Sequence, residues 1–245
     1  MAGFQQVRVG KEIEFVGDAA TRQNMTGYWN PNKIMREWNF KELTLDETNQ
    51  YTVYIDTTSA VALGNSGLTL TTAATDTKTC SYAFGGIKVL AANNPVVEFC
   101  FQLDVITTVA INAVLTDAVT EASGVLPFLI SGTTVADTAT NGVGFCRDTE
   151  QTTDRWYMVN TKAGAQAGTI VAAGLDPFAA ATNIRLRIEL LSTEVAKFYV
   201  NGVHVGSKSA STTAATPLVP YVGIRNNSAA AHVMTLRYVR LWEDA

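Results

Sequence analysis

The sequence predicts an all-β protein built as a sandwich of two antiparallel sheets. Short apolar segments alternate with polar residues along most of the chain, and long segments of helical periodicity are absent after residue 50. Gly, Asn, Ser and Thr separate these segments at intervals typical of strands and turns. About a dozen strands are expected, which is enough for two packed sheets. At 245 residues and 47% hydrophobic, the chain can bury one large core.

The composition divides the chain into two parts. Residues 1 to 50 hold 13 charged residues and two of the four tryptophans, and we predict that they form an N-terminal arm. Residues 51 to 245 are predicted to form the sandwich. Within this second part, residues 51 to 182 carry 5 basic and 11 acidic side chains, whereas residues 183 to 245 carry 7 basic and 4 acidic ones. Such a bias favours contacts between copies of the chain, although a solvated surface explains it equally well.

A short helix is predicted within the arm. Asparagine followed by proline at positions 30 and 31 is typical of a helix start. Ile34, Met35 and Trp38 would then share one face of a helix that extends to Phe40. We expect this apolar face to pack on the sandwich or to reach a neighbouring subunit.

The strands that follow are short and regularly spaced. The clearest one in the first half of the sandwich extends from Val96 to Val105, with Phe99, Phe101 and Leu103 on one face and mostly polar side chains on the other. Further strands are predicted at residues 51–56, 68–72, 80–84, 87–90, 109–115, 126–130, 143–147, 156–161, 169–172 and 217–224.

The C-terminal part predicts antiparallel strands joined by tight turns. Between residues 184 and 190, isoleucine and leucine alternate with charged residues, as in a strand with one buried face. Asn201 and Gly202 readily take the two positive-φ positions of a type I′ turn. Residues 195–200 and 203–205 are therefore predicted to form a hairpin.

The last predicted strand, His232 to Trp242, has apolar residues on both faces. Strict alternation places on one side Met234, Leu236, Tyr238 and Trp242. Valine and leucine occur on the other side as well, so both faces are expected to be covered, one by the core and the other by the arm or by another subunit. Together with Ile34, Met35 and Trp38 of the arm, these side chains form a candidate subunit interface.

Composition also argues against several classes of protein. A net charge of −4 and a pI near 5.2 disfavour nucleic-acid binding, which needs a basic surface. No segment has the character of a membrane helix, and the first residues lack the apolar core of a signal peptide, so we expect synthesis in a cytoplasm. Cys80, Cys100 and Cys146 are odd in number and widely spaced, and we predict buried free thiols.

One segment offers residues suited to sugar binding. It contains Arg155, Trp156, Tyr157 and Asn160. Sugars stack on exposed rings beside polar side chains, and this segment has both. Alternation along a strand puts the two adjacent rings on opposite faces, so at least one is expected in the core. The pattern favours packing within the sheet over sugar binding.

No catalytic motif is found. A glycoside hydrolase needs two carboxylates about 5 to 9.5 Å apart across the scissile bond, and no strand carries a compact carboxylate motif of this kind. Asp148, Glu150 and Asp154 suit an exposed polar turn, and the alternative is a calcium site, since Ca²⁺ takes oxygen ligands. We therefore expect no cofactor, with calcium at this turn as the alternative.

The order of several short segments resembles a known family. These segments are residues 143–148, 154–160, 186–189, 198–203, 217–222 and 236–242. Their succession resembles the second half of a concanavalin A-like, laminin-G-type jelly roll, in particular the versions found in bacteriophage structural proteins. The resemblance covers about residues 80 to 242 and leaves the first 50 residues outside it.

The resemblance implies a jelly-roll sandwich and a non-enzymatic virion structural protein. The expected role is that of a capsid decoration or cement protein of a tailed phage, located on the capsid surface. Its expected partners are the major capsid protein and copies of itself in a homotrimer, and binding to the assembled shell would stabilise it. A carbohydrate-binding module on a phage capsid or tail fibre, with glycans as partners, is the alternative. A polysaccharide-degrading enzyme is a weaker alternative, because this fold hosts many functions.

Overall fold

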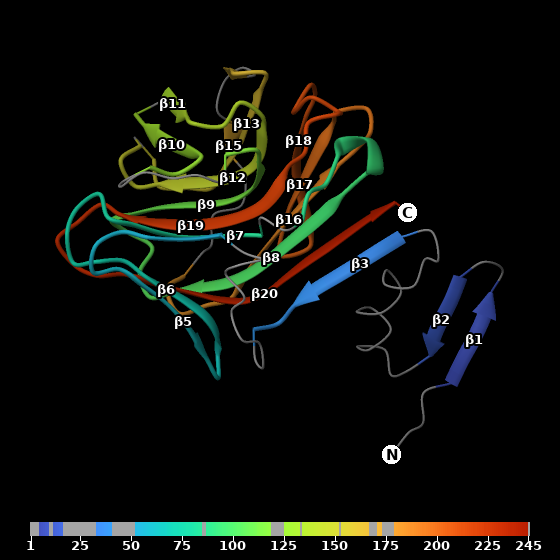
Figure 1. The fold of residues 1–245 in the computed structure, drawn as a ribbon, viewed down its shortest axis with the longest axis horizontal. Helices are drawn as coiled ribbons and strands as arrows, with labels where there is room; N and C mark the ends of the chain where they lie inside the picture. Colours follow the sequence, from blue (N-terminus) through green and yellow to red (C-terminus); the bar gives the residue numbers. More distant parts are fainter. Residues whose placement is uncertain are drawn as a thin grey trace.

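The prediction of an all-β, two-sheet jelly-roll sandwich is confirmed (Figure 1). The computed structural model describes residues 5–9, 12–16, 33–40, 52–84, 87–118, 125–132, 134–151, 153–166, 171–172 and 179–244. The regular secondary structure of these residues consists of β-strands and one short 3-10 helix at Ala91–Asn93. Within this part of the chain, no helix has the length and apolarity needed to cross a bilayer.

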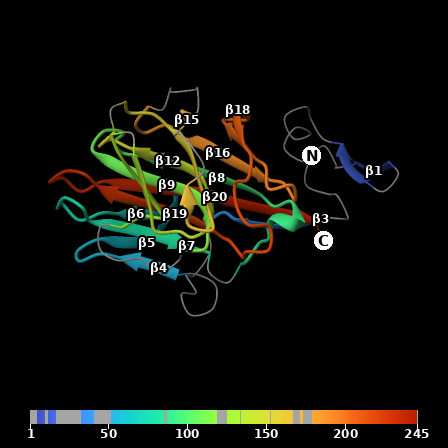
Figure 2. The ribbon, with the colours of Figure 1, turned by 90° about the horizontal axis from the view of Figure 1, so that it is seen from above.

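The first large sheet, here called the upper sheet, contains eight strands. Its order is β14-β13-β12-β9-β19-β7-β4, and β15 also pairs with β13. The strands are β4 Thr52–Ile55, β7 Thr79–Ala83, β9 Val109–Thr116, β12 Gly142–Asp148, β13 Tyr157–Lys162, β14 Ala165–Gln166, β15 Val171–Ala172 and β19 Val219–Asn226. Figure 2 looks onto this sheet from above.

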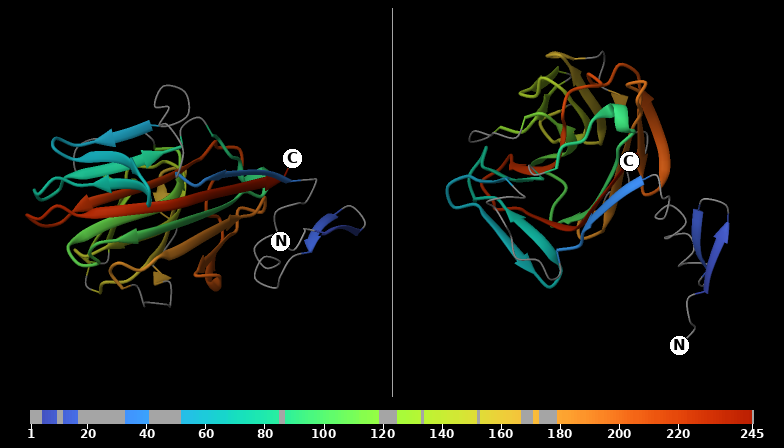
Figure 3. Two further views of the ribbon diagram at one scale, coloured as in Figure 1. Left: turned by 90° about the horizontal axis from the view of Figure 1, so that it is seen from below. Right: turned by 45° about the vertical axis from the view of Figure 1, so that its right-hand side comes forward.

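The second large sheet, here called the lower sheet, has the order β18-β17-β16-β8-β20-β6-β5, and β3 also pairs with β20. The strands are β3 Lys33–Trp38, β5 Ala60–Gly64, β6 Gly67–Thr71, β8 Val96–Leu103, β16 Ile184–Leu190, β17 Ala196–Val200, β18 Val203–Lys208 and β20 Val233–Asp244. The longest of them, β20, pairs with β8 on one edge and with β6 and then β3 on the other. Figure 3 shows β3 beside the C-terminal half of β20.

Two small hairpins complete the described elements. One joins β1 (Gln5–Val9) to β2 (Glu12–Val16), and the other joins β10 (Phe128–Ser131) to β11 (Thr134–Asp137). The β10–β11 hairpin packs on the outer face of the upper sheet, where its apolar side chains form a second core with residues of β9, β12 and β19. The main core fills the space between the two sheets.

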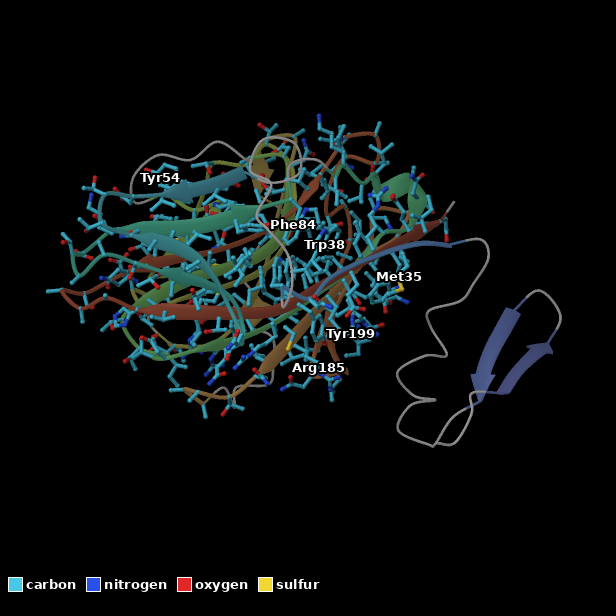
Figure 4. The ribbon with its side chains drawn as sticks, turned by 60° about the horizontal axis from the view of Figure 1, so that its bottom comes forward. Met35, Trp38, Tyr54, Phe84, Arg185 and Tyr199 are labelled. Atoms are coloured by element: carbon cyan, nitrogen blue, oxygen red, sulfur yellow. The ribbon has the colours of Figure 1, made fainter. Side chains whose placement is uncertain are left out.

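The predicted helix over residues 31 to 40 is wrong where the structure describes it. Lys33–Trp38 forms β3 instead, antiparallel to the end of β20. Since β6 covers only the first part of that edge, the remaining backbone groups of β20 need a partner, and β3 supplies it. Trp38 and Phe40 are buried against Phe84, with ring centroids 4.9 and 6.3 Å away. Figure 4 shows Trp38 beside Phe84. These arm residues therefore pack on their own sandwich.

The predicted faces of the last strand are also wrong, because β20 contains a β-bulge at Arg237. Leu236 lies opposite Phe101 and Tyr238 lies opposite Cys100, so Arg237 is one extra residue. The buried face is carried by Met234 and Leu236 before the bulge, and by Val239 and Leu241 after it. Tyr238 and Trp242 consequently lie on the outer face, where both are partly exposed. The apolar residues on both predicted faces thus belong largely to one continuous buried face.

Two local predictions are confirmed. Asn201 and Gly202 have φ angles of 51° and 84° and join β17 to β18, as a type I′ turn requires. The three cysteines are free thiols, and all of them are buried. The turn follows from the conformational preference of two adjacent residues, and the free thiols follow from the number and spacing of the cysteines.

The bulge depends on a glycine of the neighbouring strand, which gives a first prediction. Gly67 has a φ of +129°, and a Cβ at this position would lie 2.2 Å from the Leu236 carbonyl oxygen. We expect Gly67→Ala to lower the free energy of unfolding by about 2–4 kcal/mol in urea denaturation, because both the backbone conformation and the space favour glycine. Gly202→Ala is the matched control, since its φ is also positive but nothing lies within 4 Å. It should cost only about 1–2 kcal/mol, and equal losses would contradict the role of Gly67.

Candidate functional site

A polar groove of about 570 Å³ opens on the outer face of the lower sheet, beside the bulge. Its lining comes from β3, the β5–β6 turn, β8, β20 and the segment before β16. The residues are Glu37, Asn39, Asn65, Ser66, Cys100, Asn183, Arg237 and Tyr238. One aromatic ring, one carboxylate, several amides and one guanidinium group thus face the same space.

The bulge explains why Arg237 and Tyr238, which are adjacent in sequence, both line the groove. In a regular strand, successive side chains point to opposite faces, and the extra residue of a bulge interrupts that alternation. Arg237 donates hydrogen bonds to the Ser66 carbonyl oxygen, to Gln102 Oε1 and to Asn183 Oδ1, the last at 3.3 Å. Its guanidinium group is therefore held by three neutral acceptors.

Tyr238 is fixed from two sides. Its hydroxyl donates a hydrogen bond of 2.8 Å to Glu98 Oε1, and the Arg240 guanidinium lies 4.2 Å from its ring centroid. Burial and the neighbouring Glu98 carboxylate raise the pKa of the Tyr238 hydroxyl well above its usual value. The hydroxyl consequently stays protonated and remains a donor to Glu98, so the ring has one defined orientation at the groove.

A row of alternating charges crosses the sheet next to the groove. Arg240 of β20 lies opposite Glu37 of β3 on one side and Glu98 of β8 on the other, with N–O distances of 3.2 and 3.9 Å. Beyond Glu98, Arg187 of β16 stacks on the ring of Tyr199 at 4.1 Å. Figure 4 shows Tyr199 and the nearby Arg185 on this sheet.

The residues predicted to bind sugar do not form one surface. Trp156 is 1% exposed and packs edge-on against Phe101 and Phe145, so a sugar has no access to its ring. Asn160 is buried as well and donates a weak hydrogen bond to the Ser211 carbonyl oxygen. Arg155 is exposed and Tyr157 half-buried. Alternation separates the two rings, so Trp156 has the packing role that the sequence pattern favoured.

The three carboxylates predicted to form an exposed polar turn, with a calcium site as the alternative, do not share one environment. Asp148 is buried and accepts hydrogen bonds from the Ile130 and Glu150 amides and from Asn227 Nδ2, at 3.0 to 3.1 Å. The side chains of Glu150 and Asp154 are exposed. Across the described ranges, no group of three His, Cys, Asp or Glu residues could hold a metal ion. Asp148 instead fastens strand β10 to the upper sheet.

The candidate interface residues lie in three different environments. Met234, Leu236 and Trp38 belong to the core. Tyr238 lines the groove, and Met35 and Trp242 are partly exposed nearby. Ile34 is the most accessible, with 43% of its surface exposed. A contact with another subunit stays a prediction, and only the exposed members of the set are available for it.

Comparisons with known proteins identify the fold. No family model and no curated protein sequence matches the chain. The carbohydrate recognition domain of Emp46p, in its metal-free form, superposes with a TM-score of 0.57 at 13% identity, covering 83% of this chain and 94% of that one. A Bacillus licheniformis β-glucanase gives 0.58 at 12% identity, with 86% and 98% covered. The κ-carrageenase of Pseudoalteromonas carrageenovora gives 0.56 at 11% identity, with 88% and 97% covered.

These comparisons confirm the concanavalin A-like sandwich and correct one prediction. The prediction that the protein is not an enzyme is overturned, because glycoside hydrolases share this fold over most of the chain. The similar structures named above are a carbohydrate recognition domain and two glycan-cleaving enzymes. None of the three bears on a phage virion, so the capsid role, the trimer and the virion location stay predictions.

The groove was missed by the sequence analysis, although two signals pointed toward it. The basic excess of residues 183 to 245 lies largely on the outer face of the lower sheet. The adjacent Arg237 and Tyr238 interrupt the alternation of β20, which is how a bulge shows itself in a sequence. Three of their hydrogen-bond partners, Ser66, Gln102 and Glu98, lie more than 100 residues away, and sequence spacing alone could not bring them together.

The buried Asp148 gives a second prediction. Burial raises the pKa of this carboxyl group, although hydrogen bonds oppose the shift. The folded chain then binds this proton more tightly than the unfolded chain does. In the unfolded chain the pKa of an aspartate is about 3.9. The stabilisation is complete below that pH and is lost as the pH rises through the folded-state pKa. We therefore expect the unfolding free energy of the native chain, minus that of Asp148→Asn, to fall as the pH rises above about 4.

Urea denaturation at several pH values between 4 and 7 measures this difference. Thr153→Ala is the control, since it changes a neutral, exposed residue of the same turn. Its difference from the native chain should not vary with pH. A difference for Asp148→Asn that rises with pH would contradict the assignment.

Proposed function

We propose that this chain binds carbohydrate in the groove beside the bulge of β20. The observation that carries the proposal is the lining of the groove, where the Tyr238 ring lies among a carboxylate, amides and a guanidinium group. Sugars present an apolar ring face and a rim of hydroxyl groups, and these side chains complement both. The likeness in fold to the carbohydrate recognition domain of Emp46p supports the proposal.

The side chains that line the groove are already held in place by contacts within the protein. The groove volume of about 570 Å³ is within the range of small-molecule sites. Tyr238 is held by Glu98 and Arg240, and Arg237 is held by its three acceptors. Side chains that are already ordered lose little conformational entropy when a ligand binds, so a shallow site of this kind is able to retain useful affinity.

Substitution of Tyr238 tests the site, and this is the third prediction. Tyr238→Ala should weaken binding to any glycan recognised on an array by about tenfold or more, because the ring surface is lost. Tyr238→Phe should retain binding within about threefold, since the hydroxyl is directed at Glu98. The measurement is calorimetric titration of folded variants with the best glycan from the array.

Tyr157→Ala distinguishes this groove from the segment predicted by sequence. Tyr157 lies at the start of β13 in the upper sheet, and its hydroxyl donates to the Thr153 carbonyl oxygen. Loss of glycan binding in Tyr157→Ala, with Tyr238→Ala unaffected, would refute the groove as the binding site. The absence of binding to every glycan of a broad array would refute the proposed function itself.

Glycoside hydrolysis is a second candidate function, favoured by one observation. Glu37 and Glu98 lie on the two strands that flank Arg240, each directly opposite it in register. Both carboxylates contact the same guanidinium group, and Glu37 lines the groove. Glycoside hydrolases use two carboxyl groups, one as an acid and one as a base or nucleophile, and these two side chains would take those roles.

Release of reducing ends from a panel of polysaccharides tests this candidate, as the fourth prediction. Where the native chain releases them, Glu37→Gln and Glu98→Gln should each lower the rate about 100-fold or more, because proton transfer requires both groups. Glu189→Gln is the matched control, since this carboxylate of the same sheet pairs with Arg187 at 3.0 Å. Full activity in either of the first two variants, or no activity on any polysaccharide, would remove hydrolysis and leave binding as the function.

A further inference from the structure

Basic side chains are concentrated on the outer face of the lower sheet. Five of the seven basic residues after position 182 project from this face: Arg185, Arg187, Lys197, Arg237 and Arg240. Because side chains alternate along each strand, the face opposite the core collects the charged residues of β16, β17 and β20. The chain as a whole is acidic, so this face is a local exception.

Two of these arginines are compensated by carboxylates. Arg187 pairs with Glu189 at 3.0 Å, and Arg240 lies between Glu37 and Glu98. The carboxylate of Glu37 lines the groove but is directed at Arg240. These acidic side chains therefore neutralise the charged row and leave little negative charge for the groove itself.

Arg185 and Arg237 differ from those two. Within the described residues, neither forms an ion pair, and the side chain of Arg237 donates only to neutral oxygens. Both lie close to Cys100 on the groove floor: Arg185 is its partner across β8 and β16, and Arg237 is adjacent to its partner on β20. Burial and the Glu98 carboxylate raise the pKa of the Cys100 thiol, whereas these two guanidinium groups act in the opposite direction. Both guanidinium groups therefore act electrostatically on Cys100, which lines the groove.

We infer that the groove selects an anionic glycan, one whose carboxylate or sulfate groups are bound by Arg185 and Arg237. The inference rests on the proposed function and names its ligand class. A guanidinium group offers a planar fork of N–H donors that matches the oxygens of both anions. The two arginines flank the Cys100 position, so a charged sugar unit lying over it would contact both, with the Tyr238 ring beside it.

The test compares polymers that differ only in charge, and this is the fifth prediction. Calorimetric titration of the full chain uses polygalacturonate against its carboxyl-reduced form, and dextran sulfate against dextran. We expect at least one charged polymer to bind about tenfold or more tightly than its neutral counterpart, with the difference shrinking at high salt as screening increases. A preference within one pair only would show whether carboxylate or sulfate is the preferred anion.

Matched variants separate the groove from a general attraction to polyanions. Arg185 is exposed and lies opposite Cys100 at the border of the groove, so Arg185→Gln removes one positive charge there with little risk to folding. It should weaken binding of the charged polymer about tenfold and leave binding of the neutral one unchanged. Lys88→Gln removes one positive charge from an exposed position outside the lower sheet and should have an effect below about twofold.

The remaining outcomes would overturn the anionic preference, its assignment to the groove, or the proposed function. Equal affinity for charged and neutral polymers would overturn the anionic preference and leave carbohydrate binding in place. Equal losses in Arg185→Gln and Lys88→Gln would overturn the assignment to the groove, because a diffuse charge effect would explain both. The absence of binding to all four polymers and to every glycan of the array would overturn the preference together with the proposed function.

Discussion

The hydrogen-bonding requirement of strand β20 governs much of this structure. A long strand inside a sheet must satisfy its backbone groups on both edges, and β20 does so with β8 on one edge and with β6 and β3 on the other. Among the described strands of the second half of the chain, none pairs with the part of that edge that β3 completes. A segment from the arm therefore becomes part of the sandwich, and it brings Trp38 and Phe40 into the core.

The same strand shows where residue alternation predicts the buried face of a strand and where it fails. Alternation identified the buried faces of β8 and β16 correctly, because those strands are regular and each position predicts the next. It failed after Arg237, since one extra residue inverts every later position. The Asn-Pro pair and the spacing of the apolar residues predict a helix before Phe40, although the structure has a strand there. Only the free edge of β20, more than 190 residues away, decides between them.

The candidate site illustrates a second reason for the limits of sequence reasoning. The residues suited to sugar binding in the sequence lie within one segment, and its tryptophan, Trp156, is part of the core. The groove is instead assembled from five segments, and the conformation of Gly67 and the bulge bring Arg237 and Tyr238 to its surface. Residue types and charge balance indicated that a polar surface existed. Long-range pairing determined where it is.

Both outer faces of the sandwich carry polar side chains. Those of the upper sheet bind a hairpin of the same chain, whereas those of the lower sheet line a groove. On the upper sheet, Asn112 and Asp148 are buried, and their side chains bind the backbone of the β10–β11 hairpin at Phe128 and Ile130. These hydrogen bonds attach the β10–β11 hairpin to the outer face of the upper sheet. On the lower sheet, no described hairpin lies over the face, and the amide of Asn183 and the guanidinium group of Arg237 remain at an open groove. Polar groups that no described segment covers are therefore the better candidates for binding a ligand in this protein.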